Sequence, residues 1–153
     1  MSENNELMKL ENQLCFLLYA CARATTRYYR PFMDKMGLTY TQYLTMLVLW
    51  EVGTINVKRL GERLYLDSGT LTPVLKRLEE KGLVTRERST ADERNLDITI
   101  TENGRELKQQ IEATYQEMES WKPLSEEDCA VMGQLFGVAL KNLCERMEDG
   151  ESD

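Results

Sequence analysis

The chain has 153 residues, 42% apolar and 29% charged, a composition that predicts one soluble domain with a sizeable core. It contains no histidine, which removes histidine-activated nucleophiles and most catalytic zinc sites. The four cysteines show no CxxC spacing and there is no phosphate-binding glycine loop, so we expect neither metal nor cofactor, and an enzyme is disfavoured. The polar opening MSENNELMKLENQ and the lack of a long apolar run predict a cytoplasmic protein without a membrane segment.

The net charge of -7 is unevenly distributed along the chain. Residues 56–105 hold ten Lys or Arg against nine Asp or Glu, whereas the rest of the chain holds nine against seventeen. The acidity therefore lies mostly outside this central segment, so the net charge does not exclude a local basic surface for nucleic acid.

Three helices are expected in the first 66 residues. Residues 7–29 carry an apolar face too wide for one neighbour to cover, which indicates a subunit interface. Pro31 is expected to break or bend this helix. A second helix lies within LTYTQYLTMLVLWEVG, and a third spans 55–66. The cap and stop candidates are Thr39 or Thr41, Gly53 and Asn56.

The segment from Leu66 to Ile100 is predicted to form a helix followed by a β-hairpin. Its first part begins with N-cap residues, continues with leucines at helical spacing and ends at Lys81-Gly82. LVTRER and NLDITI then predict two strands, joined by the polar connector STADER. A capped helix followed at once by an arginine-bearing hairpin indicates a winged helix-turn-helix.

The residues of this segment suit double-stranded DNA. Small hydrogen-bonding groups at the start of a recognition helix can meet base edges in the major groove, and cations further along can contact phosphates. A wing-tip arginine suits a narrow A·T-rich minor groove, where Asp92 could hold Arg94 in position. Any one of these side chains is equally an ordinary solvated group, so the pattern carries the prediction. The candidate DNA-binding residues are Asp67, Ser68, Gly69, Thr70, Thr72, Lys76, Arg77, Arg86, Arg88, Asp92 and Arg94.

Two further helices complete the chain. Thr101 is expected to cap the first, which Pro123 closes, and Ser125 with Asp128 forms a capping box for the last. The predicted fold is mainly α with a small β-hairpin. It is one domain over 1–153, with a winged helix-turn-helix over 38–100 and helical dimerisation regions at 7–36 and 101–147.

This order of elements, with LDSGTLTPVLKRLEEKGLV and the wing sequence DER, resembles the MarR family of dimeric winged-helix transcription regulators. QLCFLLYACAR at 13–23, GLTYTQYLTMLVLWE at 37–51 and LDSGTLTPVLKRLE at 66–79 resemble its OhrR branch, repressors that sense organic hydroperoxides. The resemblance implies a homodimer formed by long N- and C-terminal helices. It also implies an A·T-rich inverted-repeat operator.

The resemblance gives Cys15 the role of the peroxide-reactive thiolate, with Tyr19 and Tyr29 as its hydrogen-bonding partners across the dimer. Tyr19 follows Cys15 by one helical turn, but Tyr29 lies roughly 20 Å further along the helix. Only an antiparallel partner subunit could therefore bring Tyr29 close. Oxidation to a sulfenic acid would alter the helix packing and release DNA. An apolar pocket for the peroxide is expected at Phe16, Met46 and Trp50.

Several alternatives remain open at this stage. A cysteine in an apolar helix is commonly an inert packing residue, in which case a small aromatic ligand could control the same repressor. A thiol peroxidase is a third reading, weakened by the missing histidine and CxxC partner. After oxidation, Cys129 is a possible resolving thiol, near the start of the last helix. Alternatively, the sulfenic acid of Cys15 condenses with a small thiol.

Overall fold

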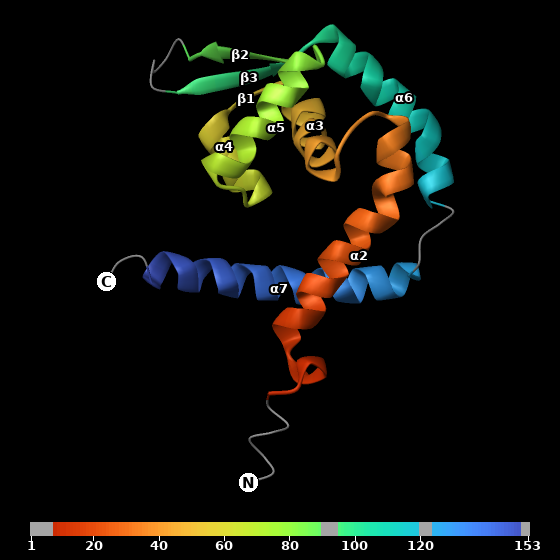
Figure 1. Ribbon diagram of the computed structural model, residues 1–153, viewed down its shortest axis with the longest axis vertical. Coiled ribbons are helices and arrows are strands. Elements are labelled where there is room, and N and C mark those ends of the chain that lie inside the picture. Colours follow the sequence, from red (N-terminus) through yellow and green to blue (C-terminus); the bar gives the residue numbers. More distant parts are fainter. Residues whose placement is uncertain (1–7, 90–94, 120–123, 151–153) are drawn as a thin grey trace. The chain divides into compact units, whose positions relative to one another are not determined.

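The computed structural model describes residues 8–89, 95–119 and 124–150 (Figure 1). The helices are α2 (Leu14–Lys35), α3 (Tyr40–Val52), α4 (Val57–Leu64), α5 (Ser68–Glu80), α6 (Glu102–Glu119) and α7 (Glu126–Gly150), preceded by the 3-10 turn η1 (Leu10–Asn12). The strands are β1 (Thr54–Asn56), β2 (Val84–Arg88) and β3 (Leu96–Ile100). The predicted fold class, mainly helical with a winged helix-turn-helix, is confirmed. None of the described helices combines the length and the hydropathy needed to cross a membrane.

The chain forms two compact units. The first runs as far as Thr114 and holds α2 to α5, the sheet and the first part of α6; the second begins at Tyr115 and holds α7. The core of the first unit lies where α3, α4 and α5 meet one face of the sheet. Its most deeply buried side chains are Met33, Thr45, Met46, Leu49, Leu60, Leu71, Leu75, Leu78, Val84 and Ile98.

Helix α2 differs from the prediction, because it continues through Pro31 as far as Lys35. It also begins later than the predicted start at residue 7, at Leu14, because the described residues before it form the 3-10 turn η1. A proline inside a helix costs about 3 kcal/mol. Phe32 and Met33, which directly follow it, are both buried, and burial of two such side chains contributes roughly 3–6 kcal/mol. The packing of these two residues therefore outweighs the proline, so the helix is not broken at Pro31, and the bend stays a prediction.

The helix caps follow the sequence signals closely. Thr39 forms a capping box with Gln42, in which the Thr39 hydroxyl accepts from the Gln42 N–H and the Gln42 side chain accepts from the Thr39 N–H. Asn56 caps α4 through the N–H of Lys58. Ser125 caps α7, although its hydroxyl donates to the Asp128 carboxylate.

Strand β1 was not predicted. It pairs antiparallel with β3, with Ile55 opposite Ile98, so the sheet has three strands in the order β1-β3-β2 and α4 starts at Val57 instead of Ile55. A strand of three residues is too short to show an alternating pattern. Its existence depends on a partner strand more than forty residues away, which local sequence does not reveal.

Candidate functional site

The amino-terminal end of α5 is held by Asp67. One carboxylate oxygen accepts from the N–H of Thr70 at 2.9 Å, and the other accepts from the Thr70 hydroxyl at 2.8 Å. These hydrogen bonds, the one from the hydroxyl first, hold the pKa of Asp67 below its usual range. Asp67 therefore fixes the start of the helix and the orientation of the Thr70 side chain.

The predicted DNA-binding residues of α5 all lie on its exposed face. Leu71, Leu75 and Leu78 are buried on the opposite face, so the helix is amphipathic as predicted. The Thr72 hydroxyl donates to the Ser68 carbonyl at 2.6 Å. The exposed residues are Asp67, Ser68, Gly69, Thr70, Thr72, Lys76 and Arg77. Their role in DNA binding stays a prediction, and the structure leaves each of them accessible.

The two described arginines of the hairpin differ. Arg88 is exposed at the end of β2. Arg86 is only 24% exposed, and its guanidinium forms an ion pair with Glu79 of α5 at 2.6 Å. This ion pair, led by its hydrogen bond, holds the pKa of Glu79 below the usual range. Arg86 thus has an intramolecular partner that the sequence did not reveal. Asp92 and Arg94, the predicted wing-tip pair, lie outside the described residues.

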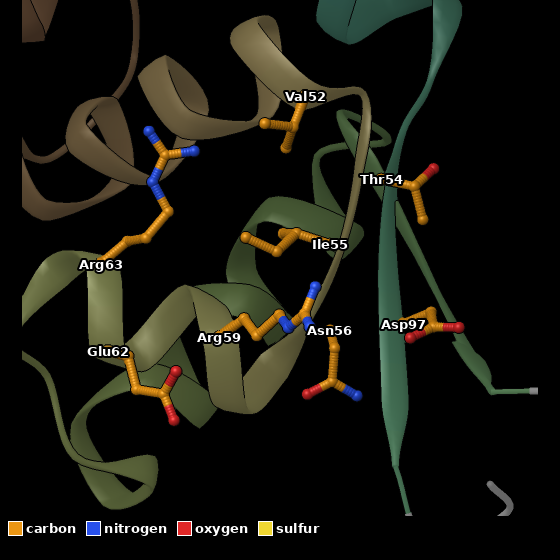
Figure 2. A pocket seen from close by; sticks show the side chains of 8 residues that line it. All are labelled: Val52, Thr54, Ile55, Asn56, Arg59, Glu62, Arg63 and Asp97. Atoms are coloured by element: carbon orange, nitrogen blue, oxygen red, sulfur yellow. The ribbon is translucent and has the colours of Figure 1, made fainter. Parts of the chain in front are cut away.

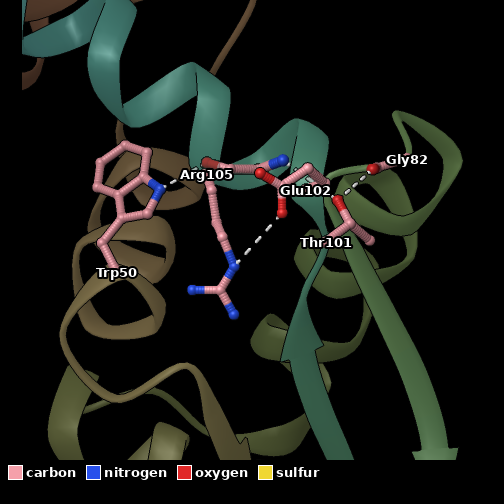
Figure 3. A network of polar contacts seen from close by, with 6 residues as sticks. Trp50, Gly82, Thr101, Glu102 and Arg105 are labelled. Atoms are coloured by element: carbon pink, nitrogen blue, oxygen red, sulfur yellow. Dashed lines mark hydrogen bonds and ion pairs between the residues drawn. The ribbon is translucent and has the colours of Figure 1, made fainter.

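A polar network joins α3, the start of α6 and the turn between α5 and β2 (Figure 3). The indole N–H of Trp50 donates to the Gly104 carbonyl at 2.7 Å. Thr101, the cap of α6, donates its hydroxyl to the Gly82 carbonyl at 2.6 Å and accepts from the Gly104 N–H at 3.2 Å. The network fixes α6 to the base of the hairpin. Of its members, sequence reasoning found only the Thr101 cap.

Cys15 is exposed in the first turn of α2. Tyr19, one turn further on and 57% exposed, accepts a hydrogen bond from Arg23 at 2.8 Å, and the Arg23 guanidinium lies over its ring. Tyr29 stacks on Tyr40 of α3, with 5.5 Å between ring centroids. The rise of an α-helix places Tyr29 roughly 21 Å along α2 from Cys15, so one chain does not bring the two together.

The predicted peroxide pocket stays a prediction, and its three residues differ in exposure within one chain. Met46 is fully buried, and the Trp50 indole is bonded to Gly104, so both belong to the core of the winged helix. Phe16 is half-buried near the other end of α2, roughly 24 Å along the helix from the buried Phe32. A peroxide would reach Met46 only after a change from this conformation, because Met46 is fully buried.

All four cysteines are free thiols. Cys21 and Cys129 are exposed, and Cys144 is half-buried. Cys129 lies in the first part of α7, as predicted for a resolving thiol. In the part of the chain that the structure describes, no group of three or more metal-binding side chains comes together.

A separate pocket of about 790 Å³ lies beside β1 (Figure 2). Arg63, on its wall, is paired with Glu51 at 2.6 Å. Its two arginines are matched by two carboxylates, and none of the predicted site residues lines it. The lining residues are Val52, Thr54, Ile55, Asn56, Arg59, Glu62, Arg63 and Asp97.

A three-helix core with a recognition helix and a β-hairpin wing is the architecture of DNA-binding winged-helix regulators. A family model described as transcriptional regulator SarA/Rot matches residues 27–111. The organic hydroperoxide resistance transcriptional regulator of Bacillus subtilis (strain 168) is 58% identical over 109 residues, which are 71% of this chain and 74% of that protein.

Solved structures of AbfR from Staphylococcus epidermidis are also similar. Reduced AbfR bound to DNA is 41% identical with a TM-score of 0.74, and the match covers 94% of this chain and 99% of AbfR. The disulfide form of AbfR is 41% identical with a TM-score of 0.63, covering 92% and 96%. The chain therefore belongs to the MarR family of winged-helix transcription regulators, as the sequence predicted, and it is a regulator rather than an enzyme.

Proposed function

We propose that this regulator is a redox-sensing repressor that leaves its operator when organic hydroperoxides oxidise Cys15. The observation that carries the proposal is the place of Cys15 in the first turn of α2, one helical turn before Tyr19 and with a thiol that its own chain does not enclose. Two similarities support it. The Bacillus subtilis relative is named for organic hydroperoxide resistance, and AbfR is known both reduced on DNA and as a disulfide. Such a regulator acts in the cytoplasm, where the DNA lies.

A homodimer is the proposed active form. Leu14 and Leu17 on α2 and Leu135 and Val138 on α7 expose large apolar side chains, with Leu14 69% and Leu135 65% exposed. Exposed apolar side chains along a helix mark a protein interface, and a second copy of the chain would cover those of α2 and those of α7. Two copies would present two α5 helices to the two halves of an A·T-rich inverted repeat in double-stranded DNA.

The chemistry at Cys15 balances as a two-electron oxidation. The thiolate attacks one peroxide oxygen, an S–O bond forms as the O–O bond breaks, and the leaving alkoxide takes a proton from water to become an alcohol. The sulfur is thereby oxidised to a sulfenic acid and the peroxide is reduced. In the dimer, Tyr19 and the partner subunit's Tyr29 would hydrogen-bond the reduced sulfur. Oxidation would break these bonds and change the spacing of the two recognition helices.

The test is operator release by a hydroperoxide. A binding duplex is first enriched from random double-stranded DNA with the reduced wild-type chain. Binding is then measured for wild type, Cys15→Ser and Cys21→Ser, before and after a stoichiometric dose of cumene hydroperoxide, and again after dithiothreitol. Cys21→Ser is the matched control, because Cys21 is an exposed thiol on the same helix.

We expect wild type and Cys21→Ser to release the duplex and to rebind it after reduction, while Cys15→Ser stays bound. Equal responses of wild type and Cys15→Ser would refute the sensor role of Cys15 and turn the search to a non-covalent ligand. Mass spectrometry of the oxidised wild type shows which thiol reacts next. A Cys129 disulfide and an adduct with a small added thiol are distinguished by their masses.

A further inference from the structure

Arg86 of strand β2 lies on the face of the sheet that packs against the helices. Side chains two residues apart share a face of a strand, so Arg86 lies on the same face as the buried Val84. Its cross-strand partner in β3 is Ile98, which is also fully buried. Arg86 therefore leaves the sheet on the core side, near α5. The Arg86 side chain therefore points toward the core side of the sheet and not into solvent.

The contact with Glu79 is well defined. The Arg86 Nε donates to Glu79 Oε2 at 2.7 Å, and Nη2 of the same guanidinium lies 2.6 Å from that oxygen. Glu79 stands in the last turn of α5, directly after the buried Leu78. Both side chains are partly shielded from water, with exposed fractions of 24% and 38%. This charge-assisted ion pair joins the last turn of α5 to the middle of strand β2.

We propose that Arg86 and Glu79 are positioning residues that fix the hairpin wing relative to α5, and that Arg86 does not contact DNA. The inference rests on the proposed function, in which α5 and the hairpin both bind one duplex. Two elements that must reach adjacent grooves together bind more tightly when their relative position is set beforehand, because less conformational freedom is then lost on binding. The ion pair supplies this restraint.

The proposal predicts that neutralising Glu79 lowers the affinity for DNA, which is the opposite of the effect expected from charge alone. A carboxylate near DNA repels phosphates, so its neutralisation should strengthen binding or leave it unchanged when the carboxylate has no other role. If Glu79 positions the wing, Glu79→Gln instead weakens binding. Glu87→Gln is the matched control, since Glu87 is an exposed carboxylate on the opposite face of β2, one residue from Arg86.

The experiment measures operator affinity over a series of salt concentrations for the full-length chain. We expect Glu79→Gln and Arg86→Gln each to lose roughly three- to fivefold in affinity, the size expected of a partly exposed ion pair, with an unchanged salt dependence. The double variant should lose no more than either single variant. Arg88→Gln, from the exposed arginine of the same strand, should instead reduce the slope of log K against log salt by about 0.9 if it contacts one phosphate.

A reversed ion pair separates positioning from a general loss of folding. Arg86→Glu alone should bind weakly, and adding Glu79→Arg should restore affinity to within about twofold of wild type. Thermal melting of every variant accompanies the binding data. The proposal is overturned if Arg86→Gln lowers the salt slope by about 0.9 while Glu79→Gln binds as tightly as wild type. It is also overturned if the reversed pair fails to recover binding while remaining folded. Failure of the wild-type chain to bind any duplex would overturn the proposed function itself, a separate result.

Discussion

Replacing Gly104 with alanine is expected to destabilise the chain by about 2–4 kcal/mol. A Cβ at this position would lie 2.7 Å from Ile100 Cγ1 and 3.3 Å from Met46 Cε, and closer still to the Leu83 carbonyl oxygen. The backbone oxygen cannot rotate away as a side chain could. The start of α6 would therefore have to move by roughly 1 Å to recover ordinary van der Waals contact.

The magnitude combines two effects. Overpacking of a well-packed core costs about 1–3 kcal/mol. A shift of α6 also stretches the 2.7 Å hydrogen bond from Trp50 to the Gly104 carbonyl, at a further cost of about 1 kcal/mol. These sums are a large part of the 5–15 kcal/mol that typically stabilises a domain.

Urea denaturation followed by circular dichroism measures the change. We expect the midpoint to fall by on the order of 1 M with an unchanged m-value. All samples must share one protein concentration, because the proposed dimerisation would make stability depend on it. Glu106→Ala is the control, an exposed position in the same part of α6, and should change stability by less than about 0.5 kcal/mol. A Gly104→Ala variant as stable as this control would refute the close-packing argument.

Three further changes test other contacts. Thr39→Ala removes the acceptor of the Gln42 N–H and should cost about 1 kcal/mol in urea denaturation, whereas Thr39→Ser should be near neutral. Trp50→Phe removes the donor to Gly104 and should cost about 1–3 kcal/mol; a loss of the same size on top of Gly104→Ala would show that the two residues act independently. The pKa of Asp67 is held below its ordinary 3.8 by the folded chain, so its stabilising effect is complete above that value and is lost as pH falls through the lowered pKa. Asp67→Asn, which keeps a cap acceptor, should therefore melt with a weaker pH dependence than wild type between about pH 5 and pH 2, and parallel curves would count against this assignment.

The local features of the fold were predictable from the sequence because their causes are local. Thr39, Asn56, Asp67 and Thr101 each cap a helix through a donor two or three residues away, a distance at which sequence spacing fixes geometry. The amphipathic face of α5 is set by helical periodicity in the same way. These signals located the recognition helix and the surface it exposes.

The errors arose where long-range packing decides the structure. Strand β1 exists through its pairing with β3, and α2 continues through Pro31 because the core receives the next two side chains. Arg86 was predicted to contact DNA because its charge and position in the hairpin suit phosphates; that prediction is untested, but the pairing of Arg86 with Glu79 was missed. The two-residue spacing of Val84 and Arg86 in β2 indicates that both side chains lie on one face of the strand. The pairing of Arg86 with Glu79 could be found only from the structure.

The continuity of α2 bears directly on the proposed sensor. Cys15 lies in its first turn, and Phe32 and Met33 are buried in the winged-helix core near its last turn, roughly 26 Å along the axis from the thiol. A helix broken at Pro31 would let its first part move without disturbing that core. An unbroken helix transmits a tilt at Cys15 to the side chains packed beside α3, because core packing resists deformation. The same core holds Trp50, whose bond to Gly104 fixes the base of the wing. In the proposed sensor, the buried Phe32 and Met33 would therefore couple a movement at Cys15 to the core that supports α5 and the wing.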